Sequence, residues 1–142
     1  MSLSWAEVTR QVVVRAADRC EYCRMHQSLQ GATFHIEHII PSSEGGSDDP
    51  ANLCLACPSC NLHKSNRITV IDPDTGQTVP LFNPRSLDWG DHFVWNGTRL
   101  VGITAVGRAT VAALDLNAPR RLLIREAESV FDLFPPDKPT PG

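Results

Sequence analysis

The sequence predicts an α+β protein in which short strands and helices surround two closely spaced pairs of cysteines. Three observations lead to this prediction: the spacing of the cysteines, a β-rich segment between the pairs, and helical periodicity near both ends of the chain. At 142 residues the chain suits one domain with an appendage, long enough to bury a hydrophobic core. No apolar run approaches the length of a membrane span, and the first residues lack the pattern of a secretory signal. We therefore expect a cytoplasmic protein.

Residues 5–19 predict an N-terminal helix that leads into the first cysteine pair. Their apolar side chains recur at a spacing of three and four residues, and Ser4 with Glu7 forms the pattern of a capping box. Residues 33–40 predict a strand, because they are rich in β-branched and aromatic side chains and alternate in polarity until Pro41 ends the pattern.

A polar loop over residues 42–50 follows this strand, and its Gly45-Gly46 pair marks a sharp turn. Residues 52–56 form a short apolar stretch before the second cysteine pair. Pro58 suits the first turn of a helix that ends at about residue 65 or 67. Strand, loop and helix in this order are typical of a ββα-metal unit, provided that the strand pairs with another one.

The second half of the chain predicts turns, a hairpin and a short helix. Residues 72–76 form a strong turn, and prolines keep residues 79–84 extended. Asn96-Gly97 lies between two β-rich runs and predicts a hairpin over residues 92–103 with a type I′ turn. A short helix is expected at residues 110–116.

A longer helix is expected from Pro119 to about residue 131 or 134. Its apolar side chains should pack inward while its arginines stay in water. The inward set is Leu122, Leu123, Val130 and Phe131, and the solvent set is Arg120, Arg121 and Arg125. The proline-rich tail, residues 135–142, is expected to be disordered. These elements divide the chain into a core of residues 1–70, an extension of residues 71–134 that packs on the core, and the tail.

Two Cys-x-x-Cys pairs frame the β-rich segment and the loop: Cys20 with Cys23, and Cys57 with Cys60. In a chain without a signal sequence, this paired spacing is typical of a tetrahedral zinc site. We therefore expect a structural Zn²⁺ bound by these four thiolates, with four small buried thiols as the alternative. Cys54 lies between two leucines and is expected to be a buried apolar thiol outside the site.

The residues around the two cysteine pairs resemble the HNH endonuclease family, in its cysteine-containing subgroup. The resemblance rests on Cys20-x-x-Cys23, Ile36-Glu37-His38-Ile39-Ile40-Pro41, Gly45-Gly46, Asn52-Leu53 and Cys57-x-x-Cys60-Asn61-x-x-Lys64. Residues 72–134 are similar to the C-terminal extension of small bacterial, especially cyanobacterial, HNH proteins. The resemblance implies a His-Me finger (ββα-metal) core and metal-dependent hydrolysis of DNA phosphodiester bonds, with 5′-phosphate and 3′-hydroxyl products.

His38 is the expected general base, because a neutral imidazole can take a proton from water near neutral pH, and the resemblance gives His38 the same role. Glu37 stands where the family usually has a metal-binding aspartate, and Asn61 stands where its last histidine often stands. Carboxylate and amide oxygens favour Mg²⁺ or Mn²⁺. We therefore expect Glu37 and Asn61 to hold one catalytic ion, although Glu37 and His38 would point to opposite faces of a regular strand.

Asn52 and Lys64 complete the expected site. Asn52 would hydrogen-bond across the loop and hold His38 in register, and it could cap a turn instead or as well. Lys64 follows Asn61 by three residues on the same helical face and would meet a phosphate as a point charge. His63 points away from this face and is a weaker candidate for a metal ligand.

DNA is the expected partner, and no membrane is expected. The net charge of −3 runs against DNA binding, because phosphate contacts usually require a basic balance. The alternative is a non-catalytic zinc-ribbon module that binds nucleic acid or protein, which the acidic charge and the variant Glu37 and Asn61 favour. Intact His38 and Asn52 favour the enzyme, because a pure binder needs no general base. No residue supports or excludes a third class, an accessory nuclease that requires a partner.

Overall fold

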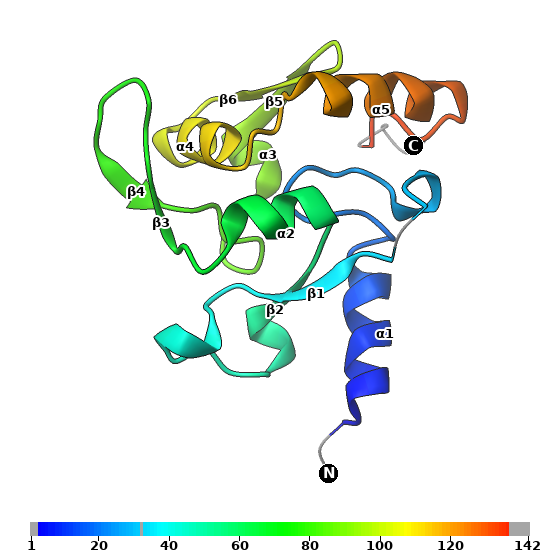
Figure 1. Cartoon of the computed structure of the whole chain (residues 1–142), viewed down its shortest axis with the longest axis vertical. Helices are drawn as coiled ribbons and strands as arrows, with labels where there is room; N and C mark the ends of the chain where they lie inside the picture. The colour runs from blue at the N-terminus through cyan, green and yellow to red at the C-terminus, as the bar shows by residue number, and fades with distance from the viewer. Residues whose placement is uncertain (1–2, 32, 137–142) are drawn as a thin grey trace.

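Small antiparallel sheets and short helices alternate along the chain. The computed structural model describes residues 3–31 and 33–136, and within them it contains three two-stranded sheets and five α-helices (Figure 1). The sheets are β1 (His35–His38) with β2 (Leu53–Ala56), β3 (Thr69–Ile71) with β4 (Thr78–Pro80), and β5 (Phe93–Asn96) with β6 (Arg99–Gly102). The helices are α1 (Trp5–Arg15), α2 (Pro58–Lys64), α3 (Trp89–His92), α4 (Ala105–Ala113) and α5 (Pro119–Val130). The predicted α+β class is confirmed.

β1, β2 and α2 form the ββα unit that the sequence predicts. The antiparallel register places Glu37 opposite Cys54 and His38 opposite Leu53. All four residues of β2 are buried, so this strand lies inside the core beneath β1 and α1. The strand expected over residues 33–40 shortens to β1, because the chain turns away directly after His38.

Two helix boundaries differ from the sequence prediction. The capping box of Ser4 and Glu7 begins α1, but the helix ends at Arg15 because Ala17 and Asp18 adopt left-handed φ angles of 55° and 61°. The helix expected at 110–116 begins at Ala105 instead, since the Thr104 hydroxyl accepts a hydrogen bond from a backbone N–H in its first turn.

The β5–β6 hairpin forms, but its turn lies one residue later than expected. Asn96 pairs with Arg99, so the loop residues are Gly97 and Thr98. Gly97 has a φ of 61°, whereas Thr98 does not have a positive φ. Glycine at the first loop position is the type II′ pattern, not the type I′ pattern expected from Asn96-Gly97. The predicted turn at residues 72–76 forms the loop of a further hairpin, β3–β4, which the sequence analysis missed.

The extension packs directly on the cysteine-rich half, and one hydrophobic core runs through both. The Trp89 indole donates a hydrogen bond to the Tyr22 carbonyl at 2.9 Å, and Arg85 forms an ion pair with the buried Glu21. β3 spans residue 70, the expected boundary between core and extension. The predicted tail lies outside the described residues from position 137 onward. No described helix has both the length and the apolar character that a membrane span needs.

α5 is oriented opposite to the prediction. Leu123, Val130 and Phe131 are 65%, 81% and 64% exposed, whereas Arg121 and Arg125 are 3% and 1% exposed. The expectation that these apolar side chains pack inward and that these arginines face water is therefore wrong. The inner face of α5 meets backbone carbonyls and a cysteine sulfur, which guanidinium groups can bind and alkyl groups cannot.

Candidate active site and metal centre

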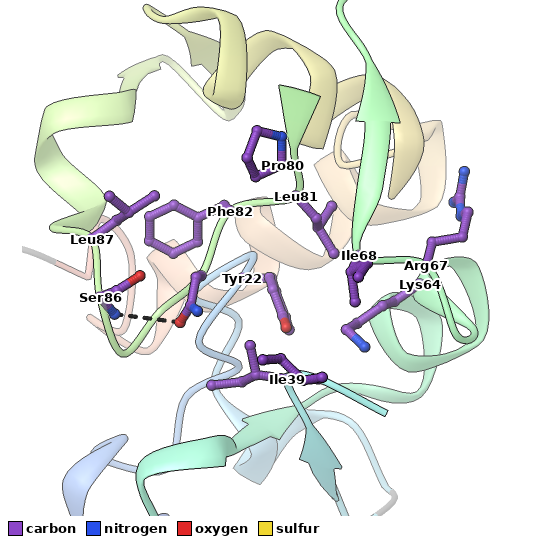
Figure 2. A pocket seen from close by; sticks show the side chains of 12 residues that line it. Tyr22, Ile39, Lys64, Arg67, Ile68, Pro80, Leu81, Phe82, Ser86 and Leu87 are labelled. Atoms are coloured by element: carbon purple, nitrogen blue, oxygen red, sulfur yellow. Dashed lines mark hydrogen bonds between the residues drawn. The ribbon is translucent and has the colours of Figure 1, made fainter. Parts of the chain in front are cut away.

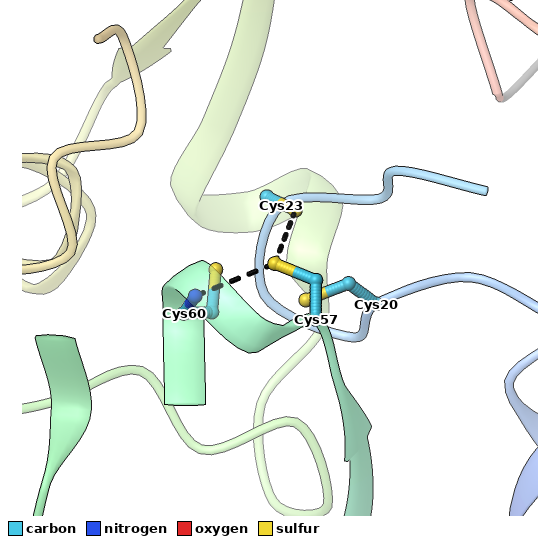
Figure 3. A group of neighbouring side chains, drawn as sticks. All are labelled: Cys20, Cys23, Cys57 and Cys60. Carbon is cyan, nitrogen blue, oxygen red and sulfur yellow. Dashed lines mark hydrogen bonds between the residues drawn. The ribbon is translucent and has the colours of Figure 1, made fainter. Parts of the chain in front are cut away.

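The four cysteines converge in a buried cluster, as the sequence predicts (Figure 3). Their sulfur atoms all lie within 4.8 Å of one another, and Cys23 Sγ lies 3.8 Å from Cys57 Sγ. Four sulfurs at about 2.3 Å from a tetrahedral Zn²⁺ would lie about 3.8 Å apart, so the cluster fits this ion. Cys54 lies outside the cluster, with its Sγ 3.7 Å from the Tyr22 hydroxyl.

The electrostatics of the cluster also favour a bound cation. Hydrogen bonds from Cys20, Cys23 and Cys60 hold the pKa of Cys57 far below its usual value. Burial raises the pKa of Cys20 and of Cys60 well above the usual value of a thiol. Without a metal, these shifts favour a thiolate at Cys57 and thiols at Cys20 and Cys60, and a divalent cation would stabilise the thiolate forms of the cluster.

Glu37 and His38 line one polar cavity of about 220 Å³ at the end of β1, together with Pro41, Ser42, Ser43 and Asn66. The two adjacent side chains share this cavity because β1 ends at His38. His38 is oriented by Asp48, whose Oδ1 lies 2.6 Å from the His38 Nε2. The His38 side chain is 27% exposed, so water and substrate can reach the imidazole.

Asn52 fixes the loop that follows β1. Its Oδ1 accepts a hydrogen bond from the Ile40 N–H at 2.9 Å, and its Nδ2 donates to the carbonyls of Ile40 and Ser47. The Asn52 carbonyl also accepts a hydrogen bond from the Ile39 N–H. Asn52 thus holds the backbone beyond His38, and its described hydrogen bonds do not include one to the imidazole. Gly46 is required beside this clamp, because a Cβ there would lie 1.7 Å from the Ile40 carbonyl oxygen.

Lys64 does not reach the surface, and this contradicts its expected role as a phosphate contact. The residue is 1% exposed. Its Nζ donates to the Glu37 Oε1 at 3.3 Å and to the His38 carbonyl at 3.1 Å. Burial directs the ammonium group into the site, where it orients the carboxylate and the backbone of the two candidate residues.

Asn61 is half-buried on α2, three residues before Lys64, and it is not among the residues that line the cavity of Glu37 and His38. Its side chain makes no hydrogen bond to any described residue, so its amide oxygen is free to bind a ligand. His63 points elsewhere: its Nδ1 lies 2.8 Å from the Ser59 carbonyl, and it lines a separate cavity of about 520 Å³ near α5.

A third cavity, of about 340 Å³, lies between the end of β1 and the segment after β4 (Figure 2). Tyr22 and Ile39 face Leu81 and Phe82 across it. Its wall is mainly aliphatic and aromatic and contains no carboxylate, so it is not suited to a catalytic metal.

Sequence reasoning missed Asp48 and Asn66 as parts of the site. Asp48 lies in the polar loop and Asn66 just after α2, where no periodic pattern indicates the direction of a side chain. The only available signal was their polarity next to recognised motifs.

Residues 20–67 match the family model of the HNH endonuclease. This span contains the four cysteines, the β1–β2–α2 unit and every candidate catalytic residue. The resemblance to this family is therefore confirmed for residues 20–67. No curated protein and no solved structure matches the chain.

Proposed function

Because residues 20–67 match the HNH endonuclease family, we propose that this protein is a metal-dependent endonuclease that hydrolyses DNA phosphodiester bonds. The observation that carries the proposal is the cavity in which Glu37 and His38 meet, one offering a carboxylate and the other an accessible imidazole. A nuclease needs both groups at one phosphate: a base for water, and a ligand for a cation.

His38 acts as the general base in this proposal. When the Nε2–H donates to Asp48, the Nδ1 atom carries the free lone pair and can take a proton from water. Asp48 thereby selects the tautomer and limits rotation of the ring. The deprotonated water attacks phosphorus in line with the leaving 3′ oxygen.

Glu37 and Asn61 would hold the catalytic cation. Asn66 lines the cavity of Glu37 and offers a further amide there, whereas Asn61 is not among the residues that line it. The oxygen donors of these residues fit Mg²⁺ or Mn²⁺, and the ion, when bound, supplies charge stabilisation at the phosphate and the leaving oxygen. Lys64 keeps one oxygen of Glu37 fixed, which leaves the other oxygen available to a ligand.

Two observations favour the alternative, a zinc-ribbon module that binds nucleic acid or protein without cleavage. The Lys64 ammonium neutralises Glu37, so it competes with a cation for this carboxylate. The acidic net charge of −3 points the same way.

Nicking of supercoiled plasmid in Mg²⁺, Mn²⁺, Zn²⁺ or EDTA separates the two functions. The nuclease proposal requires cleavage with Mg²⁺ or Mn²⁺ that EDTA abolishes. It also requires that Glu37→Gln need a higher metal concentration than the wild type, since the variant keeps the size of the side chain and loses the charge. DNA binding without nicking under all four conditions would favour the binding module.

A further inference from the structure

α5 brings a buried guanidinium group to the cysteine cluster. Arg121 is 3% exposed, and its Nη1 lies 3.3 Å from the Cys60 Sγ. Its Nη2 donates to the Ser59 hydroxyl at 2.8 Å and to the Leu114 carbonyl at 3.0 Å. These contacts fix the planar fork of the arginine against the first turn of α2, which carries Cys60.

Arg125 lies one turn further along α5 and is buried as well. Its guanidinium group donates to the Thr98 and Leu116 carbonyls at 2.8 and 2.6 Å, and it covers the Trp95 ring. Neither arginine forms an ion pair with a carboxylate in the described part of the chain. Glu128, the buried acid on the same helix, instead accepts a hydrogen bond from the His26 N–H.

Glu128 partly offsets the charge of Arg125. Arg121 has no carboxylate partner among the described residues, so it needs another source of negative charge. Burying an unpaired charge is costly, and arginine stays protonated even when buried. Four thiolates around one divalent zinc ion leave two negative charges in excess. The cysteine cluster in its zinc-bound state would therefore supply the counter-charge that Arg121 requires.

We propose that Arg121, supported by Arg125, is the counter-ion of the zinc–tetrathiolate centre, and that α5 sets how tightly the zinc is held. Arg121 lies outside residues 20–67, so a residue of the extension completes a metal centre whose ligands all belong to the family-matched segment. The proposal concerns the structural metal and stands whether or not the protein cleaves DNA.

The test compares Arg121→Met with Arg120→Met in the zinc-loaded, full-length protein. The two variants remove the same charge from adjacent positions, but Arg120 is exposed. Zinc transfer to an excess of a chromophoric chelator is followed with time, and circular dichroism checks that each variant is folded. Arg121→Met should lower zinc affinity and accelerate zinc release about 10–100-fold, the usual effect of removing a partner of a metal ligand, while Arg120→Met should match the wild type.

A purely structural role for Arg121 predicts a different result. The melting temperature of Arg121→Met would then fall by the same amount in zinc-loaded and chelator-treated protein, and the rate of zinc release from the folded variant would equal that of the wild type. This outcome would overturn the proposal. If Arg121→Met does not fold, Arg121→Lys decides, because it retains the charge and loses the fork. The rate of zinc release from Arg121→Lys should lie between the wild-type rate and the about 10–100-fold faster rate expected for Arg121→Met, because the charge is retained. A rate as fast as that expected for Arg121→Met would show that the charge does not hold the zinc and would overturn the proposal.

Discussion

Replacing Gly46 with alanine should damage the loop that positions His38. A Cβ at this position would lie 1.7 Å from the Ile40 carbonyl oxygen and 2.9 Å from the Asn52 Nδ2, whereas real Cβ contacts essentially never fall below 3.0 Å. The backbone at Ile40 must therefore move by more than an ångström, and this movement breaks the hydrogen bond from Asn52 Nδ2, which measures 3.0 Å.

The free energy of unfolding should fall by about 2–4 kcal/mol, which combines the steric strain with one or two lost hydrogen bonds. Nicking should fall by about 10²-fold, because Ile40 follows His38 by two residues and a displacement of 1 Å at the reacting groups has this effect. Urea unfolding of the zinc-loaded protein, followed by tryptophan fluorescence, measures the stability.

Gly90→Ala is the matched control for Gly46→Ala. A Cβ at Gly90 meets no atom within 4 Å, and its φ is not positive. Its stability should stay within about 1 kcal/mol of the wild type. A Gly46→Ala variant as stable and as active as Gly90→Ala would refute the inference that the Asn52 clamp positions His38, the proposed general base.

Three further predictions follow from buried or paired charges. Lys64→Met should destabilise the protein by about 2–4 kcal/mol in urea unfolding, because Glu37 loses its partner; the salt dependence of DNA binding should not change, and a shallower slope would restore the phosphate role. Asp48→Ala should slow nicking by about tenfold or less, since the contact is exposed and contributes on the order of 1 kcal/mol, and an unchanged rate would remove its orienting role. Hydrogen bonds from Arg108 lower the pKa of Asp72 from 3.8 to about 2. This stabilisation is complete above pH 4 and is lost as the pH falls toward 2, so the melting temperature of the wild type should drop more steeply over this range than that of Asp72→Asn.

The cysteine spacing and the ββα order were predictable because each depends on local chemistry. Cys-x-x-Cys pairs have few uses other than metal binding, and Pro58 fixes the start of the helix that follows. The orientation of α5 was not predictable, because the rule for amphipathic helices assumes an apolar interior. Arg121 is buried against a cluster of sulfur atoms and backbone carbonyls, a surrounding that only the tertiary structure reveals.

The candidate site also contains residues that the sequence predicts and residues that it does not. Glu37 and His38 were predictable from their motif, although strand alternation argued against a shared cavity; the early end of β1 resolves this conflict. The burial of Lys64 depends on how α2 crosses β1, which no local pattern records. Asp48 could not be predicted because its loop bends back to His38 over ten residues.

Plasmid nicking by His38→Ala, compared with His35→Ala, tests the proposed catalysis most directly. His35 lies on the same strand and is exposed, so it controls for the loss of an imidazole from β1. With saturating Mn²⁺ or Mg²⁺, His38→Ala should lower the rate by about two to four orders of magnitude and leave DNA binding nearly intact, while His35→Ala should retain most of the activity. Two results would contradict a general base at this position. One is wild-type protein that binds DNA but does not nick it in the presence of any divalent metal, and the other is equal nicking rates for His38→Ala and the wild type.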